Sequence, residues 1–223
     1  MTGVTSDTTT ERATAHAGRG KGDGYHHGDL PNALRTAGVE LIAERGLGGF
    51  SLREVARRAG VSHTAPAHHF GDVKGLLTSI AAEGFDELHL ALEEAMATGG
   101  DDPVERLVAI GRAYVDFARS NPGHGEVMFR TDIIDDDDAD LAQCGLEAYA
   151  DLERSVQALI DAEGLTVGVD EASWLCWSAM QGLVELSPKL DRMSLLRDTP
   201  SPSVDDLIVR FTHLMVDGLR HAT

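Results

Sequence analysis

Apolar side chains recur every three or four positions from residue 34 almost to the end of the chain, and this spacing limits the possible folds most. Residues three and four apart share one face of an α-helix, whereas a half-buried strand alternates every second residue. No alternating stretch is present, so we expect an all-α fold. The expected helices span residues 29–46, 51–59, 62–69, 72–96, 103–121, 126–130, 138–163, 170–186 and 204–221.

Two of these helices are short and are joined by a very tight turn. Ser51 and Glu54 have the spacing of a capping box, in which both side chains satisfy the free amides at a helix start. Gly60 ends that helix, because glycine adopts the left-handed backbone that a tight turn requires. Ser62 is then placed to cap the next helix, which runs to about His69. Together with residues 29–46 they predict an N-terminal three-helix helix-turn-helix domain.

Charge divides the chain into two parts. Residues 1–75 hold nine Lys and Arg against eight Asp and Glu, whereas residues 76–223 hold ten against twenty-nine. An acidic body is repelled by phosphate, so only the first part suits a nucleic acid partner. We expect a flexible arm at residues 1–24, a DNA-binding domain at residues 25–75, and a C-terminal helical ligand-binding and dimerisation domain at residues 76–223.

Composition excludes several classes of protein. The chain has 223 residues, of which 42% are hydrophobic, and that is enough for a core without disulfides. No apolar run approaches the ~20 residues that cross a bilayer, and residues 1–21 hold no secretory signal. We therefore expect a cytoplasmic protein without a membrane partner, in which Cys144 and Cys176 are reduced and buried.

The segment ending at Leu77, which contains AGVELIAERGLGGFSLREVARRAGVSHTAPAHHFGDVKGLL, resembles the DNA-binding domain of TetR-type regulators. Residues 113–122, AYVDFARSNP, with Met128 and Phe129, are similar to the family subgroup named for a Trp-His-Gly motif. Gln181 stands at the histidine position of that motif. The resemblance implies a homodimer that binds double-stranded DNA at a palindromic operator, most simply a repressor that a small-molecule effector of unknown identity releases.

The chain departs from the family at two positions. Ala67 stands where the family usually has a tyrosine that reaches a DNA phosphate. Val73 stands where the family tends to carry a lysine, and Lys74 follows one residue later. Because one residue rotates the side chain by ~100° around a helix, Lys74 replaces that lysine only if the geometry allows it.

We expect the third helix to enter the major groove, where base edges differ. Its N-terminal end then faces the bases, and neighbouring polar side chains approach phosphates. The alternative for the histidines is a solvated or internally satisfied side chain, and Arg57 with Arg58 is more typical of a solvated face. The expected base-facing residues are Ser62, His63, Thr64 and Ala65, and the expected phosphate-facing residues are Arg53, His68, His69 and Lys74.

The last two helices carry wide apolar stripes that a single copy would leave exposed, which predicts a two-fold dimer interface. The alternative is that both stripes belong to the core of one protomer. Aromatic and methionine side chains of the intervening helices could line an effector cavity, although each alone is more often core. The interface candidates are Trp174, Leu183, Leu207, Phe211, Leu214 and Met215, and the cavity candidates are Phe85, Tyr114, Phe117, Met128, Phe129, Trp177 and Met180.

Other functions have weaker support in the sequence. The acidic run at residues 135–138 could hold Mg²⁺ in an isoprenoid enzyme, but no second acidic motif faces it, and a helix start explains it better. We expect no catalytic residues, metal or cofactor. The remaining alternative is a small-molecule carrier or partner-binding helical module with a degenerate helix-turn-helix.

Overall fold

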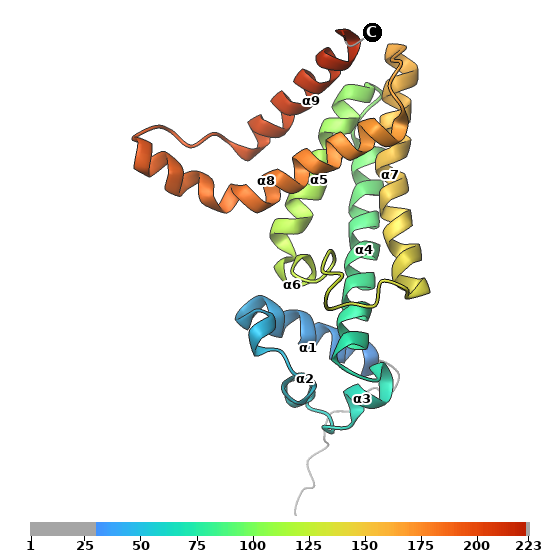
Figure 1. Cartoon of the computed structure of the whole chain (residues 1–223), viewed down its shortest axis with the longest axis vertical. Coiled ribbons are helices and arrows are strands. Elements are labelled where there is room, and N and C mark those ends of the chain that lie inside the picture. Colours follow the sequence, from blue (N-terminus) through green and yellow to red (C-terminus); the bar gives the residue numbers. More distant parts are fainter. Residues whose placement is uncertain (1–29, 222–223) are drawn as a thin grey trace, which may run out of the picture. The chain divides into compact units, whose positions relative to one another are not determined.

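The computed structural model describes residues 30–221, and every regular element in that range is a helix. This confirms the all-α fold for the described part of the chain. The expected arm at residues 1–24 lies outside the described residues. The elements are α1 (Leu30–Arg45), the 3-10 turn η1 (Leu47–Gly49), α2 (Leu52–Arg58), α3 (Ala65–Phe70), α4 (Val73–Thr98), α5 (Pro103–Ser120), α6 (Pro122–Gly125), α7 (Ala139–Glu163), α8 (Val169–Arg197) and α9 (Val204–His221) (Figure 1).

Side-chain caps fix the starts of four helices. Ser51 accepts a hydrogen bond from the Glu54 amide at 3.3 Å, as half of a capping box would. The Glu54 carboxylate, expected to complete that box, instead accepts hydrogen bonds from two arginines. Asp72, Asp102 and Asp138 cap α4, α5 and α7 in the same way, each accepting from an amide at 2.8–2.9 Å. The acidic run at residues 135–138 therefore ends in a helix cap.

The prediction that Ser62 begins the third helix is wrong. The Ala65 amide donates to the Ser62 carbonyl at 3.0 Å, which closes a turn ahead of the helix, and the hydroxyls of Ser62 and Thr64 lie 3.2 Å apart. Pro66 has no amide hydrogen and suits only the first turn of a helix, so α3 begins at Ala65. Ser62, His63 and Thr64 thus precede α3 rather than forming its first turn.

Two other helix predictions need correction. The short helix expected at residues 126–130 lies earlier, at α6, because Pro122 is preorganised for a first helical turn, and turns follow from Val127 to Arg130. Helix α8 runs to Arg197 rather than ending at residue 186, with Pro188 inside it. Pro188 has no hydrogen to donate to the Val184 carbonyl, and that carbonyl accepts from the Ser187 hydroxyl at 3.4 Å instead.

Helix α4 connects the helix-turn-helix to the remaining helices. Pro31 and all later described residues belong to one compact unit, so the expected boundary at residue 75 falls within the first turn of α4. Near its start α4 contacts α3, and further along it packs against α5 and most extensively against α7 (Figure 1). The close approach of α1 to Ile80 of α4 needs Gly38, since a Cβ there would lie 2.7 Å from the Ile80 side chain.

The core of the C-terminal region is apolar and consists of three clusters of buried side chains. They lie between α4, α5, α7, α8 and α9, as expected for amphipathic helices. No helix among residues 30–221 is long and apolar enough to span a membrane. The fully buried members with the largest side chains include Leu159, Val108, Val115, Val156 and Val216.

Candidate nucleic-acid interface and ligand cavity

Helices α2 and α3 and the turn between them form a helix-turn-helix with an exposed leading edge. Gly60 adopts φ 70°, and the Val61 amide donates to the Ala56 carbonyl at 3.0 Å, so the tight turn forms as predicted. Pro66 is buried and anchors α3 on the domain. The base-facing candidates Ser62, His63 and Thr64 are exposed, and Ala65 is half-buried.

The phosphate-facing candidates differ in their freedom to reach DNA. Arg53, His68 and His69 are exposed, and the two imidazole rings contact each other edge to face with centroids 5.4 Å apart. Lys74 is also exposed, but its ammonium group donates to Asp135 of the segment before α7 at 3.0 Å. Lys74 can therefore bind a phosphate only by leaving Asp135.

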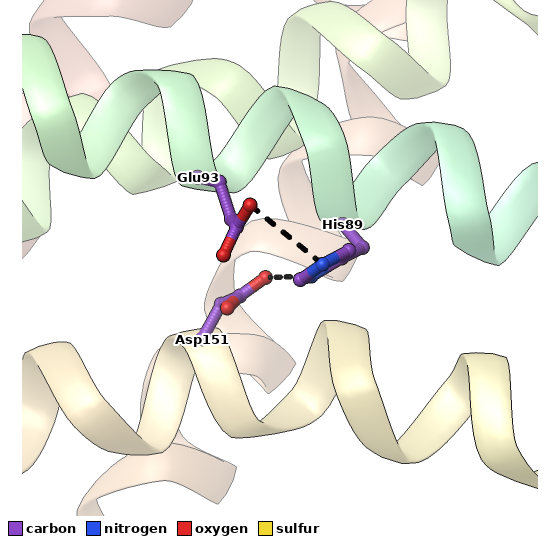
Figure 2. Close-up of side chains that lie close together, drawn as sticks. All are labelled: His89, Glu93 and Asp151. Carbon is purple, nitrogen blue, oxygen red and sulfur yellow. Dashed lines mark hydrogen bonds and ion pairs between the residues drawn. The ribbon is translucent and has the colours of Figure 1, made fainter.

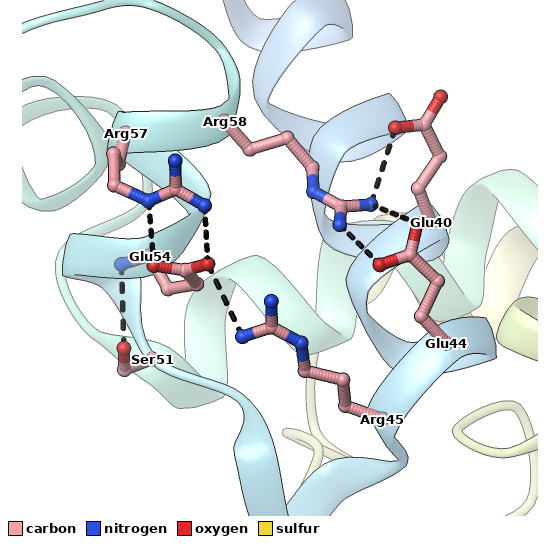
Figure 3. Close-up of polar contacts among 7 residues, drawn as sticks. All are labelled: Glu40, Glu44, Arg45, Ser51, Glu54, Arg57 and Arg58. Atoms are coloured by element: carbon pink, nitrogen blue, oxygen red, sulfur yellow. Dashed lines mark hydrogen bonds and ion pairs between the residues drawn. The ribbon is translucent and has the colours of Figure 1, made fainter.

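The arginine pair in α2 serves the fold of the domain. Arg57 makes two hydrogen bonds to Glu54, at 2.6 and 2.9 Å, and Arg45 of α1 contacts the same carboxylate at 3.3 Å (Figure 3). Arg58 reaches back to Glu44 of α1 at 3.0 Å. The hydrogen bonds from Arg57 lower the pKa of Glu54 to about 2. Arg45 and Arg58 therefore join α1 to α2, whereas Arg57 pairs with Glu54 within α2, and the spacing of Glu54 and Arg57 on one helix face was a sequence signal for that pair alone.

An apolar cavity of about 80 Å³ lies among the helices that follow. Five of the seven candidates line it, namely Phe85, Tyr114, Phe129, Trp177 and Met180. Phe117 and Met128 do not: both are buried beside Leu88 and Leu92 in the core. Helical periodicity cannot separate a core position from a cavity wall on the same face. Lining residues that the sequence did not suggest include Gly145, Ala148, Tyr149, Leu152 and Thr212.

The aromatic side chains at the cavity form a packed cluster. The Phe85 and Phe129 rings meet edge to face with centroids 5.4 Å apart, and Phe129 lies 5.6 Å from Trp177. Trp174 and Tyr149 continue the cluster beyond Trp177. Phe85, Phe129 and Trp177 also line an adjoining hollow of about 470 Å³, so these three rings separate the cavity from that hollow.

One polar group ends the apolar wall. The Tyr114 hydroxyl donates to Gln181 Oε1 at 2.6 Å and accepts from Trp177 Nε1 at 3.0 Å. The Gln181 amide nitrogen in turn donates to Glu185 at 3.3 Å. Burial raises the pKa of Tyr114 to about 12, so the phenol is neutral at physiological pH.

The interface candidates on α8 and α9 divide between outward and inward positions. Trp174 and Leu214 are 57% and 72% exposed, and Leu183 and Leu207 are half-buried. Phe211 lines the cavity, and Met215 packs on the core with its sulfur 3.3 Å from Cys176. Further exposed apolar side chains of α8 are Leu175 and Leu186, which the apolar stripe had also suggested, and Met193, Leu195 and Leu196, which it had not.

A polar cluster joins α4 to α7 on another face. His89 Nδ1 lies 2.8 Å from the fully buried carboxylate of Asp151, and His89 Nε2 lies 3.8 Å from Glu93 (Figure 2). These residues could in principle ligate a metal, since one ligand atom of each lies within 4.8 Å of the others. Arg154, however, pairs with Asp151 and Glu93 and already supplies the compensating positive charge. The cluster therefore acts as an ion network between two helices.

An exposed helix-turn-helix followed by a helical region is the architecture of DNA-binding transcriptional regulators. Residues 34–88 match a sequence profile described as bacterial regulatory proteins of the tetR family, and residues 107–211 match one described as the Tetracyclin repressor-like C-terminal domain. The chain belongs to the TetR family.

Individual relatives agree with this assignment. The chain is 36% identical over 77 residues to the HTH-type transcriptional regulator BetI of Stenotrophomonas maltophilia, a match that covers 34% of this chain and 39% of that protein. The chain thus aligns with about two fifths of the curated relative.

Two solved structures share the fold over most of the chain. A protein of unknown function from Rhodococcus sp. RHA1 is 27% identical, with a TM-score of 0.75 over 90% of this chain and 100% of that chain. A regulatory protein of the tetR family from Rhodococcus RHA1 is 19% identical, with a TM-score of 0.66 over 85% of this chain and 96% of that chain. The second likeness concerns the fold alone.

Proposed function

We propose that the protein is a DNA-binding transcriptional regulator whose operator affinity depends on a small ligand in its C-terminal cavity. The observation that carries the proposal is the exposed edge of Ser62, His63 and Thr64, held ahead of α3 by the buried Pro66. Small polar side chains beside a helix N-terminus suit the donors and acceptors of the major groove. Such a regulator would act in the cytoplasm.

The basic and polar side chains around this edge would contact the DNA backbone. Arg53 at the head of α2 and His68 with His69 on α3 are exposed and can approach phosphates. Arg57 and Arg58 are engaged by glutamates and are left out of the interface. The electrostatic contribution then comes from few cations, so the affinity should depend on salt less steeply than for a strongly basic protein.

A homodimer would present two such edges to a palindrome. The exposed apolar side chains of α8 and α9, which include Trp174 and Leu214, are the surface that pairing would bury. Leu183 and Leu207 lie half-buried on the same two helices and would complete the contact. The alternative, that these helices serve only the protomer core, explains Phe211 and Met215 but leaves the exposed side chains unexplained.

Ligand binding would change the DNA affinity through a shift in population. Helix α4 carries Phe85 and Leu88 at the cavity and Lys74 at the DNA-facing end, so one rigid element contacts both sites. A ligand that fits only the arrangement with mis-spaced α3 helices releases the operator, and the protein is then a repressor. Membership of the Trp-His-Gly subgroup remains a prediction that rests on residues 113–122 with Met128 and Phe129, and Gln181 in place of the motif's histidine is a departure from it.

A mobility shift with the DNA that flanks the gene tests the proposal. The native dimer should bind one palindrome, with an affinity that falls as salt rises. Thr64→Glu should abolish specific binding, because it places a carboxylate against the bases, and size-exclusion chromatography should show an unchanged dimer. Thr166→Glu, at an exposed position between α7 and α8, is the matched control and should bind as the native protein does. Equal operator affinity of the two variants would contradict the docking, and ligand uptake without DNA binding at any salt would favour the carrier.

A further inference from the structure

We propose that the cavity takes a small uncharged, largely apolar ligand, and that it discriminates against carboxylates and ammonium ions of the same shape. This inference rests on the ligand-responsive regulator proposed above and names the chemical class of its ligand. The residues that carry it are the cavity lining, the Tyr114 hydrogen bonds and Phe129.

The lining of the cavity offers no partner to a charge. None of its residues is Lys, Arg, His, Asp or Glu. The ionisable groups that do line it are kept neutral: burial raises the pKa of Tyr114 and of Cys176 to about 12, and it raises the pKa of Tyr149 as well. An ion placed among such side chains loses its hydration without gaining a counter-ion. A neutral ligand does not incur this cost.

Two hydroxyls of the wall, those of Tyr114 and Thr212, are already satisfied by the protein. The Tyr114 hydroxyl both donates and accepts, to Gln181 and from Trp177. The Thr212 hydroxyl donates to the carbonyl of Ile208 at 3.0 Å within its own helix. Since buried polar groups need partners and these two have them, neither hydroxyl requires a polar ligand. A ligand with one hydroxyl can exchange with this network, whereas an ion cannot be neutralised by it.

Charges outside the wall disfavour anions further. Glu185, one hydrogen bond beyond Gln181, lies behind the polar end of the cavity. Residues 76–223, which form the surrounding helices, hold twenty-nine acidic against ten basic side chains. A carboxylate ligand would therefore meet a repulsive field as well as an apolar wall.

The aromatic cluster is arranged for apolar contact rather than for a cation. A cation is bound by open ring faces. Here Phe85 and Phe129 meet at an interplanar angle of 88°, so the edge of one ring covers the face of the other. Trp177 packs on Phe129 and on Trp174, with ring centroids 5.6 and 5.1 Å apart. Because neighbouring rings cover these ring faces, the cluster presents an apolar surface to the ligand.

Phe129 determines the size of the ligand. The cavity of about 80 Å³ is smaller than the ~150 Å³ apolar cavity that holds benzene, so an aromatic ring enters only when a lining side chain moves. Phe129 is 38% exposed and separates the cavity from the adjoining hollow of about 470 Å³. Its displacement would open one continuous space.

Gly145 allows the cavity to be filled without disturbing the fold. It lies within α7 and lines the cavity, and a Cβ added there would meet no atom within 4 Å. A larger side chain at this position should occupy the ligand's space while favouring the helix, because glycine is a poor helix former. Gly145→Leu therefore removes the space, and Gly145→Ala is the matched control that keeps most of it.

Binding of three ligands that share one ring tests the proposal on the full-length protein without DNA. Benzyl alcohol, benzoate and benzylammonium are titrated by fluorescence, because the only two tryptophans, Trp174 and Trp177, lie in the aromatic cluster. Benzyl alcohol should bind and raise Tm, and both ions should bind at least about a hundredfold more weakly. Gly145→Leu should lose the alcohol with its Tm maintained, and Gly145→Ala should retain it.

The opposite results overturn the proposal. Binding of benzoate or benzylammonium within tenfold of the alcohol would contradict the ligand class, and alcohol binding to Gly145→Leu at native affinity would contradict the site. If none of the three ligands binds while the native protein still shifts its operator, this inference fails and the DNA-binding function stands. If the alcohol binds and no operator is shifted, the inference about the ligand stands and the proposed DNA-binding function fails.

Discussion

The helix-turn-helix region and the cavity region are both helical, yet charged side chains have opposite places in them. In the first region Arg45 and Arg58 join α1 to α2 through glutamates at the surface, and Arg57 pairs with Glu54 within α2 (Figure 3). In the second, charges are kept away from the cavity and apolar side chains such as Leu159 fill the core. The helix-turn-helix region fixes its helices with surface ion pairs and leaves few cations free, whereas the helices around the cavity keep charged side chains out of its wall and place their ion pairs, such as His89 with Asp151, on another face.

The largest expected effect lies in the apolar core. Leu159→Ala should lower the free energy of unfolding by about 2–5 kcal/mol, because the side chain is 1% exposed and its loss leaves a cavity. Urea denaturation of the purified protein measures it. Leu146→Ala, on the same helix but 64% exposed, is the control and should change stability little. Similar losses in both variants would mean that burial in α7 does not determine stability.

The next effect separates free from engaged arginines within the DNA-facing region. Arg53→Ala should weaken operator binding about tenfold and reduce the salt slope by about one, because Arg53 is exposed and makes no ion pair with another described residue. Arg57→Ala should leave the operator affinity nearly unchanged and lower Tm slightly, since its partner is Glu54. Mobility shifts at several salt concentrations compare the two. A larger loss of operator affinity for Arg57→Ala than for Arg53→Ala would show that Arg57, and not Arg53, contacts the DNA.

A smaller effect should appear where the two regions meet. Asp135→Asn should strengthen operator binding about two- to fivefold, because it frees Lys74 from an exposed ion pair of modest strength. Asp137→Asn removes an equal charge nearby and controls for the reduced net charge. Fluorescence anisotropy with labelled operator DNA resolves such differences. Equal gains in the two variants would show that Lys74 is not restrained by Asp135.

The smallest expected effect is a pH dependence of stability. The hydrogen bond to Asp151 raises the pKa of His89, which Glu93 and Glu147 also face, while Arg154 stays charged beside them. The stabilisation that protonated His89 gives to the folded protein is therefore complete below the ordinary histidine pKa of about 6.5. It is lost as the pH rises through the raised pKa of His89.

Thermal unfolding between about pH 6 and pH 9 measures this contribution. His89→Asn should flatten the decline of Tm with rising pH, and His68→Asn, at an exposed position of α3, should leave it unchanged. If Tm depends on pH in the same way in His89→Asn and in the native protein, the His89 cluster does not cause the pH dependence.

The sequence predicted the elements whose signals are local. The helix starts at Ser51, Asp72 and Asp138 and the glycine turn at Gly60 depend on neighbouring residues only and formed as expected, except that Glu54 did not complete the capping box with Ser51. The start of α3 was misplaced because Ser62 carries a strong capping signal while Pro66, four residues later, fixes the helix start. Local signals therefore compete, and the stricter backbone constraint prevails.

The cavity could be predicted only in part, because it depends on contacts between distant helices. Phe85, Tyr114 and Trp177 lie in its wall, whereas Phe117 packs in the core, and Met128 packs there while also lining the adjoining hollow. The pairing of Lys74 with Asp135 joins positions far apart in the sequence, and no spacing rule indicates it.

The segment between α6 and α7 is fixed to the rest of the protein near both of its ends. Phe129 forms part of the cavity wall, and Asp135 holds Lys74 while its amide donates to the Thr78 hydroxyl of α4 at 2.8 Å. Only a few residues separate Phe129 from Asp135. A displacement of Phe129 should therefore also move Asp135. Exchanging this short stretch between related proteins should therefore change how much a bound ligand alters the operator affinity, without changing which operator is recognised.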